Sequence, residues 1–244
     1  MWMDVKMVAT IAGGLSWTIA YISAISASFR DQTYGMPVVA LALNFSWEVI
    51  WTFKAFYEPP SLHLYVTLLW GLTDIGLIVC YLSFGRSEFG PYVTRPIFVV
   101  ASALLFVVAF ALQEAFIVQL GASANLISAF LQNALMSWLF ISMFFARCGT
   151  RGQTLTVAVF KCIGTLAPTI LFGFIYLMPL IIVLGMICFV LDVVYIGLVA
   201  GADGGGIIDW CGVPENAARG SHPMGTKVIR RGRWKVGERG LRLV

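Results

Sequence analysis

Charged residues are scarce in this sequence, and hydrophobic residues are abundant. Only 11% of its 244 residues are Asp, Glu, Lys or Arg, whereas 59% are hydrophobic. Soluble globular domains contain about 25% charged residues. The composition therefore excludes a soluble domain and predicts an all-α, polytopic membrane protein.

Several motifs that would indicate other structures or chemistries are also missing. The five cysteines have no paired spacing and no C-x-x-C, which argues against a disulfide framework and a structural zinc site. We interpret most of them as small apolar packing residues. Neither D-D-x-x-D, an Asp-rich motif suited to binding Mg²⁺, nor D-x-D-D occurs. We expect no metal and no cofactor.

Seven apolar runs are long enough to cross a hydrocarbon core of about 30 Å, which requires roughly 20 helical residues. We therefore expect a seven-transmembrane-helix bundle in residues 1–203, followed by a basic, Gly-rich, flexible tail in residues 204–244. This tail is suited to contact with anionic membrane lipid rather than nucleic acid. The runs are residues 8–28, 37–56, 62–84, 97–120, 125–146, 155–176 and 179–202.

Basic residues predict the orientation of this bundle. With seven spans, the eight basic residues of the tail fall on the same side as five arginines of the connecting segments, against Lys6 and Lys54 on the other side. Cytoplasmic loops carry an excess of Lys and Arg. We therefore expect a cytoplasmic C-terminus and an N-terminus that is outside or lumenal. The five arginines are Arg30, Arg86, Arg95, Arg147 and Arg151.

Three acidic residues lie inside the predicted spans. Glu48 stands in ALNFSWEVIW (42–51), and Asp74 and Asp192 stand in the third and seventh runs. Counted along its own helix, each lies roughly 15 Å from the cytoplasmic end, near the midplane. A charged residue there costs about 2.5–3.5 kcal/mol on insertion scales, so an inward-facing functional site is the default interpretation.

Polar and aromatic residues at helical spacing from these acids predict a pocket. Asn44 precedes Glu48 by four residues, and Trp47 and Trp51 are also four apart, so they occupy adjoining stripes of one helix. We expect the following residues to bind the substrate: Asn44, Trp47, Trp51, Trp17, Tyr21, Asp74, Gln113, Asn133 and Tyr195.

Such a pocket is suited to acid chemistry. Burial favours the neutral form of a carboxyl, and a dry carboxylic acid that faces aromatic rings can donate a proton to a weakly basic apolar substrate. Indole faces then stabilise the resulting cation. Two alternatives remain open: a proton-coupled transport site, and acids neutralised for structure by Lys161 and the amides.

The motifs DQTYGM (31–36), ALNFSWEVIW (42–51) and RCGTRG (147–152), with Asp192 and Tyr195 as Asp-x-x-Tyr, resemble the small seven-helix membrane terpene cyclases of the paxilline and pyripyropene type. The resemblance covers residues 17–200. It implies an essential catalytic pair, Glu48 and Asp192, and a cyclase that protonates an epoxide or terminal alkene of a prenylated indole or other aromatic precursor. It leaves open which acid is the donor.

The same resemblance implies partners and a location for this protein, and two positions of this chain differ from the family pattern. Asp74 stands where an amide is more usual and Gln113 where a His is, which bears on the substrate rather than on the reaction class. Expected partners are a prenylated small molecule, a prenyltransferase and an epoxidase. The expected location is the plasma membrane for a bacterial member and the endoplasmic reticulum for a fungal one.

Two rival functions make predictions that the sequence does not meet. A transporter that uses the three acids as a proton relay predicts a repeat of the first three helices in the last three, and none is visible. A retinal photoreceptor requires a Schiff-base Lys in the last helix. The seventh run has no Lys, and Lys161 lies in the sixth.

Overall fold

Seven α-helices account for most of residues 2–203, which the computed structural model describes together with residues 235–237 and 240–242. Two 3-10 turns, η1 (Gly85–Glu88) and η2 (Gly121–Ser123), and a π-helix, η3 (Thr169–Ile175), connect some of them. The helices are α1 (Trp2–Asp31), α2 (Val38–Ala55), α3 (Leu62–Phe84), α4 (Arg95–Leu120), α5 (Ala124–Arg147), α6 (Leu155–Pro168) and α7 (Pro179–Asp203).

The C-terminal residues contain a separate short element. Strands β1 (Lys235–Gly237) and β2 (Gly240–Arg242) pair antiparallel, with Val236 opposite Leu241. The predicted flexible tail falls mainly on residues 204–234, which lie outside the described residues, as do residues 238–239 and 243–244.

The helices are apolar enough for an integral membrane protein. Within the described residues, five stretches have the length and composition to cross a membrane, and the longest, Arg95–Arg147, includes α4, η2 and α5. The 18 residues of α2 lie outside these stretches and contain the charged and amide side chains of Asn44, Glu48 and Lys54 as well as the hydroxyls of Ser46 and Thr52. These polar groups lower the mean hydropathy of a helix that is only 18 residues long.

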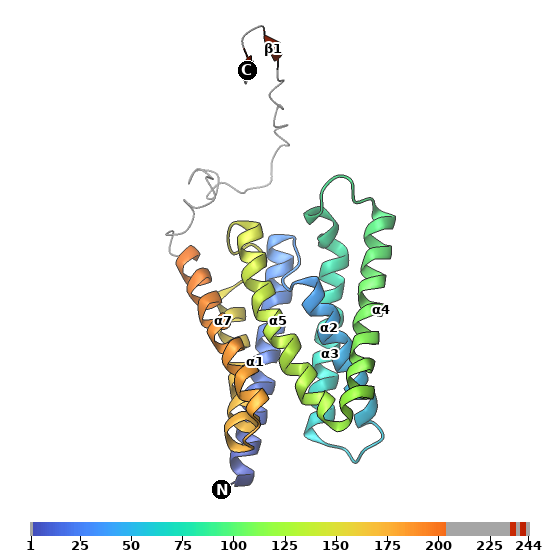
Figure 1. Ribbon diagram of the computed structural model, residues 1–244, viewed down its shortest axis with the longest axis vertical. Helices are drawn as coiled ribbons and strands as arrows, with labels where there is room; N and C mark the ends of the chain where they lie inside the picture. The colour runs from blue at the N-terminus through green and yellow to red at the C-terminus, as the bar shows by residue number, and fades with distance from the viewer. Residues whose placement is uncertain (1, 204–234, 238–239, 243–244) are drawn as a thin grey trace. The chain divides into compact units, whose positions relative to one another are not determined.

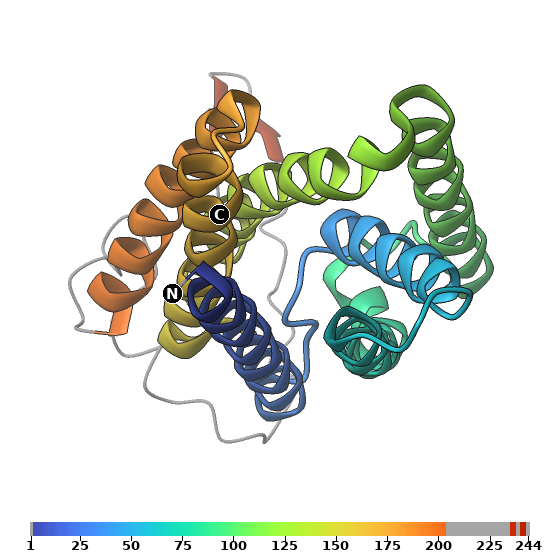
Figure 2. The same ribbon diagram turned by 90° about the horizontal axis from the view of Figure 1, so that it is seen from below.

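The helices form a closed ring in which each one packs against two ring neighbours. Going around it, α1 packs on α3, α3 on α2, α2 on α4, α4 on α5, α5 on α7, α7 on α6 and α6 on α1. The view along the bundle in Figure 2 shows α2, α3 and α4 on one side and α1, α6 and α7 on the other, with α5 between them. Figure 1 shows that the helices run roughly parallel to one direction.

Local sequence explains several helix ends. Ser61 caps α3 by accepting a hydrogen bond from the Leu64 N–H at 3.3 Å, and Thr154 caps α6 by accepting one from Val157 at 3.1 Å. Pro168 is the last residue of α6, at the change from α6 to η3. Proline lacks the N–H that would continue an α-helical ladder, so the altered hydrogen-bond pattern begins there.

Loop residues meet at the end of the bundle where α1, α3 and α5 finish, and we call this set the loop cluster. Here the Gly152 N–H donates to Asp31 at 2.7 Å. The Thr33 hydroxyl donates to Glu88 at 2.8 Å, and Arg151 pairs with Glu88 at 2.6 Å. The DQTYGM and RCGTRG motifs therefore contribute to one contact network between three loops.

The cysteines differ in part from expectation. Cys80, Cys162 and Cys188 are free and buried, as expected of packing residues. Cys148 is disulfide-bonded, so the expectation that the cysteines form no disulfide is wrong at this position. Cys211 lies outside the described residues. The expectation failed because sequence spacing does not report which cysteines come together in space.

Candidate active site

A large cavity opens between the helices. Its volume is about 1100 Å³, and its lining comes from α1, α2, α3, α4, η2, α5, α6 and η3, whereas α7 contributes no residue to it. Ligand pockets for drug-sized molecules measure about 300–1000 Å³. The cavity is therefore large enough for an extended organic molecule.

Glu48 lines this cavity and is only 1% exposed. Its Oε1 accepts a hydrogen bond from the Tyr21 hydroxyl at 3.2 Å and another from Asn44 Nδ2 at 2.8 Å. Its Oε2 has no hydrogen-bond partner among the described residues. A Cβ added to Gly71 would lie 3.9 Å from Oε2, so this glycine of α3 leaves space beside the acid.

Asp74 lies next to Glu48 and is fully buried. Its Oδ2 accepts a hydrogen bond from Asn44 Nδ2 at 2.9 Å, the same nitrogen that contacts Glu48 and lies 2.7 Å from the Tyr21 hydroxyl. Asp74 itself is not among the residues that line the cavity. One amide nitrogen therefore contacts two carboxyls and a phenol. The contact between Asn44 and Glu48 is the one that their spacing on α2 predicted.

Two glutamines fix the direction of the Asn44 amide. Gln132 Nε2 donates to Asn44 Oδ1 at 3.5 Å, and Gln113 Nε2 donates to Gln132 Oε1 at 2.8 Å and to the Leu43 carbonyl at 3.4 Å. Because Oδ1 accepts from Gln132, the NH₂ group is the end that faces the acids. Gln113, predicted to bind the substrate, is buried behind the cavity lining and orients this network instead.

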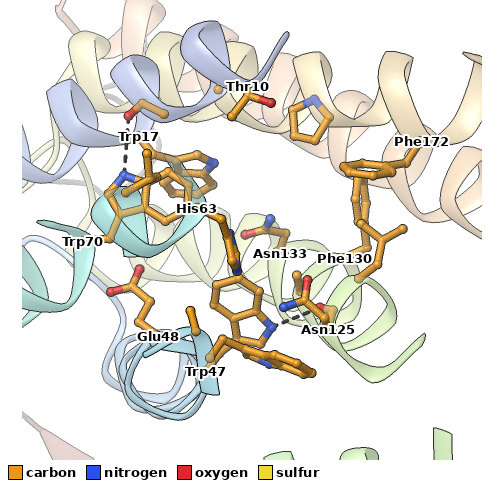
Figure 3. A pocket seen from close by; sticks show the side chains of 18 of the residues that line it. Thr10, Trp17, Trp47, Glu48, His63, Trp70, Asn125, Phe130, Asn133 and Phe172 are labelled. Atoms are coloured by element: carbon orange, nitrogen blue, oxygen red, sulfur yellow. Dashed lines mark hydrogen bonds between the residues drawn. The ribbon is translucent and has the colours of Figure 1, made fainter. Parts of the chain in front are cut away.

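Aromatic side chains form much of the wall. Figure 3 shows Glu48 with the rings of Trp47, His63 and Trp70 around the same space. Trp47 lies 6.3 Å from Trp51 and 6.3 Å from His63 between ring centroids. The Trp47 indole donates to the Asn125 carbonyl at 3.0 Å, which fixes the ring.

The predicted residues Trp17, Tyr21 and Asn133 also line the cavity. Trp17 is 7% exposed and packs 5.5 Å from Tyr21 between ring centroids. Asn133 projects from α5 toward the cavity in Figure 3. The predicted residues of α1, α2 and α5 named here thus line the same cavity as Glu48.

The structure places Asp192 elsewhere. Asp192 is fully buried on α7 and pairs with Lys161 of α6 at 2.6 Å, and Lys161 also donates to the Ser137 hydroxyl at 2.6 Å. Asp192 is not among the cavity-lining residues, so it does not share this cavity with Glu48. Lys161 lies 6.0 Å from the Trp17 ring, which links the ion pair indirectly to the cavity wall.

Tyr195 also lies away from the cavity. It is fully buried on α7, and its ring lies 5.3 Å from Phe140 between centroids. The expectation of a pocket role for Tyr195 is not supported by this position. The physical reason is the ring order of the bundle, in which α7 packs on α5 and α6 and contributes nothing to the cavity lining.

Several lining residues were missed by sequence reasoning. His63, Val66 and Trp70 occupy one face of α3 at spacings of three and four residues, and Phe130 and Phe172 come from α5 and η3. The spacing on α3 was a usable signal, because Asp74 continues the same face one turn after Trp70. The π-helix that presents Phe172 had no comparable signal in the sequence.

Charged groups mark one end of the cavity. Lys54, Glu58 and His63 line it where α2 ends and α3 begins. Lys54 Nζ lies 5.4 Å from the Trp51 ring, within cation–π distance. The described residues contain no group of three His, Cys, Asp or Glu side chains placed to hold a metal ion.

Comparisons with known proteins identify the family. Residues 2–200 match the model of the Pyr4-like transmembrane terpene cyclases. The Pyr4-family terpene cyclase mfmH of Annulohypoxylon moriforme is 37% identical over 78 residues, 32% of this chain and 31% of the relative. The terpene cyclase macJ of Penicillium terrestre is 26% identical over 163 residues, 65% of this chain and 62% of the relative.

A longer match is found with the terpene cyclase pyr4 of Aspergillus fumigatus, which is 28% identical over 202 residues, 77% of this chain and 83% of the relative. The matched part of this chain spans about a third of mfmH and less than two thirds of macJ. No solved structure matches the chain. On the match of residues 2–200, the chain belongs to the Pyr4-like transmembrane terpene cyclases.

Proposed function

We propose that this protein is a terpene cyclase in which Glu48 protonates an epoxide or terminal alkene of a prenylated aromatic compound and the cavity guides a polyene cyclisation. The observation that carries the proposal is the position of Glu48, a buried acid on the wall of a cavity of about 1100 Å³. Family membership supports the reaction class and does not favour the transporter alternative.

The surroundings of Glu48 suit proton donation. Oε1 already accepts hydrogen bonds from Tyr21 and Asn44, so the proton of the neutral acid belongs on Oε2, which has no partner among the described residues. In the first step the Glu48 O–H bond breaks, a C–H or O–H bond forms on the substrate, and the electron pair stays on the carboxylate. The two existing hydrogen bonds stabilise that carboxylate.

The aromatic wall suits the carbocation that follows. Trp17, Trp47, Trp51 and Trp70 line the cavity around the acid. A ring face attracts a cation by about 0.5–2 kcal/mol, with the larger values in dry sites. Mostly apolar walls also keep water from capturing the cation before the rings close. Proton loss ends the cascade.

We propose that the prenyl tail enters first and that the aromatic head stays near Lys54, Glu58 and His63. Glu48 lies toward the middle of α2, whereas the charged residues lie near its end, so the two ends of the cavity differ in polarity. In a seven-span bundle with a cytoplasmic C-terminus, this charged end is the outer or lumenal one. A prenyltransferase and, for an epoxide substrate, an epoxidase would supply the precursor.

We assign Asp192 a supporting role rather than that of donor. Its carboxylate neutralises Lys161, and Lys161 lies behind Trp17, which lines the cavity. Because Asp192 does not line the cavity and its carboxyl lies 2.6 Å from Lys161, it does not reach a substrate bound beside Glu48. The loss of Asp192 would therefore act on Trp17 and on the packing of α6 against α7.

The proposal is tested by Glu48→Gln. The amide keeps the shape and hydrogen-bonding capacity of the acid but cannot donate a proton in this way. We expect the cyclisation rate of a farnesylated indole, supplied with and without a terminal epoxide to the full-length protein in membranes, to fall roughly 10²- to 10⁴-fold. Uncyclised substrate should accumulate.

Glu114→Gln is the matched control, because Glu114 is an exposed acid on α4 that does not line the cavity. This variant should keep the parent rate. Unchanged cyclisation by Glu48→Gln would contradict the proposal. Substrate uptake into proteoliposomes that requires a proton gradient and is abolished by the same substitution would support transport instead.

A further inference from the structure

Asp74 is a buried acid beside Glu48 that has no role in the proposed function so far. Asp74 is fully buried and lies behind Glu48 as seen from the cavity. Asn44 Nδ2 lies 2.8 Å from Glu48 Oε1 and 2.9 Å from Asp74 Oδ2, so the two carboxyls are held side by side. They are close enough to hydrogen-bond to each other once one of them carries a proton.

No positively charged side chain of the described residues pairs with these two carboxyls. Among the ion pairs of the described residues, none includes Glu48 or Asp74, and buried Lys161 is engaged by Asp192. The titratable group that α1 adds is the phenol of Tyr21, which donates to Glu48. Two buried carboxylates without a cation would repel each other and lack solvation, which makes the doubly ionised state costly.

Counting hydrogen-bond donors leads to the same conclusion. The Asn44 amide has two protons but lies within hydrogen-bonding distance of three oxygens, on Tyr21, Glu48 and Asp74. Without further protons, Glu48 Oε2 and Asp74 Oδ1 have no partner although both atoms are buried. A proton on Asp74 converts it from an acceptor into a donor, and the adjacent Glu48 is available to accept.

We infer that Asp74 is kept as a neutral carboxylic acid and acts as a positioning residue that stabilises the Glu48 carboxylate left after proton donation. The neutral state of Asp74 does not depend on the proposed function. Its role in stabilising the Glu48 carboxylate rests on that function. When Glu48 loses its proton to the substrate, three donors converge on it: the Tyr21 O–H, the Asn44 N–H and the Asp74 O–H. Asp74 keeps its own proton throughout and shares it through the hydrogen bond.

Infrared spectroscopy of the full-length protein in detergent or lipid tests the protonation state without any reaction. A protonated carboxyl has a C=O stretching band that is separate from carboxylate bands and moves in D₂O. We expect such a band at neutral pH, with one part removed by Asp74→Asn and another by Glu48→Gln. Asp192→Asn is the matched control, because a buried Asp paired with Lys161 should contribute nothing to the band.

An unchanged band in Asp74→Asn would overturn the inference, because Asp74 would then be ionised. This readout stands even for a chain that performs no cyclisation, so it separates failure of the inference from failure of the proposed function. Asn has nearly the same size as Asp and has an N–H donor, so Asp74→Asn should fold, and a change in the band then reports the lost carboxyl.

The rate of cyclisation tests the second part. Asp74→Leu removes a hydrogen bond to a charged group and should lower the rate roughly 10- to 100-fold, whereas Asp74→Asn, which keeps a donor, should lose less. The high-pH limb of the rate should also change in Asp74→Asn, because one of two interacting carboxyls no longer titrates. Equal losses in both variants with an unchanged pH profile would reduce Asp74 to a packing residue.

Discussion

At the scale of single residues, the site depends on which partner each buried acid has. Glu48 and Asp74 share the Asn44 amide and have no cation among the described ion pairs, whereas Asp192 lies 2.6 Å from Lys161. The first arrangement favours neutral acids and the second favours an ion pair. Three acids at similar predicted depth therefore have different chemistry.

Replacement of the Lys161 and Asp192 ion pair separates a structural from a catalytic role. Asp192→Leu alone leaves a buried ammonium with the Ser137 hydroxyl as its remaining partner and should destabilise the protein by about 3–5 kcal/mol. Lys161→Met combined with Asp192→Leu removes both charges and should recover most of that loss. Thermal unfolding in detergent and the cyclisation rate are the measurements.

We expect the double variant to cyclise substrate, because Glu48 is the proposed donor. A double variant that is as stable as the parent but inactive would contradict this assignment. It would return Asp192 to the catalytic pair that the sequence motif predicted.

The residue-level predictions succeeded where helical spacing alone decides the neighbour. Asn44 and Glu48 are four residues apart on α2 and do contact each other at 2.8 Å. Depth in the membrane, by contrast, is set by position along a helix and says nothing about its rotation or its place in the ring. The sequence therefore could not reveal that Asp74 faces Glu48. Neutralisation by Lys161, which the sequence left open as an alternative, is the arrangement found for Asp192.

At the scale of elements, most helix bounds followed from hydrophobicity. The predicted third span, residues 62–84, coincides with α3 (Leu62–Phe84), because a turn rich in Pro precedes it and polar residues follow it. The predicted sixth span contains α6 and the π-helix η3. Apolar content locates a helix but does not distinguish its hydrogen-bond pattern, so the sequence did not reveal η3 as a π-helix.

The contact between α1 and α6 provides a prediction at this scale. A Cβ added to Gly164 would lie 2.8 Å from Cδ1 of Trp17, so this glycine allows the indole to approach α6 closely and line the cavity. Gly164→Ala should displace Trp17 and destabilise the protein by about 1–3 kcal/mol through overpacking. We expect a changed ratio of cyclised products, measured by mass spectrometry and chromatography.

Gly197→Ala is the matched control on α7, because a Cβ at Gly197 meets no atom within 4 Å. Alanine favours a helix over glycine by up to about 1 kcal/mol, so this variant should be as stable as the parent or more stable. A product ratio that Gly164→Ala leaves unchanged would show that the position of Trp17 does not guide the cyclisation.

At the scale of the whole molecule, the cavity is lined from two sides of the bundle, by α2, α3 and α4 and by α1 and α6. Figure 2 shows these two sets of helices on opposite sides. Such an arrangement requires connections that hold both sides at a fixed distance. The loop cluster is one of them, because it joins the loop after α1, the turn η1 after α3 and the loop after α5. Sequence reasoning identified two of its motifs but could not assign them a contact.

Arg147, at the end of α5, contacts the backbone of Arg151 in this cluster and gives the last prediction. Its Nη1 donates to the carbonyls of Tyr34 and Arg151, both at 2.9 Å, and its guanidinium lies 4.3 Å from the Tyr34 ring centroid. Hydrogen bonds from charged groups contribute about 1.5–3 kcal/mol each. Arg147→Met should therefore lower the midpoint of thermal unfolding in detergent by several degrees, at roughly 2–4 °C per kcal/mol.

Arg151→Met is the control variant, because it removes the ion pair with Glu88 and leaves the Arg147 contacts to the backbone in place. The Arg151 side chain is 51% exposed in its pair with Glu88, and exposed ion pairs contribute only about 0–1 kcal/mol. Its carbonyl, which accepts from Arg147, is retained in the variant. We expect a small shift for Arg151→Met and a large one for Arg147→Met. Equal shifts would mean that the ion pair, rather than the Arg147 contacts to the backbone, holds the two sides of the cavity together.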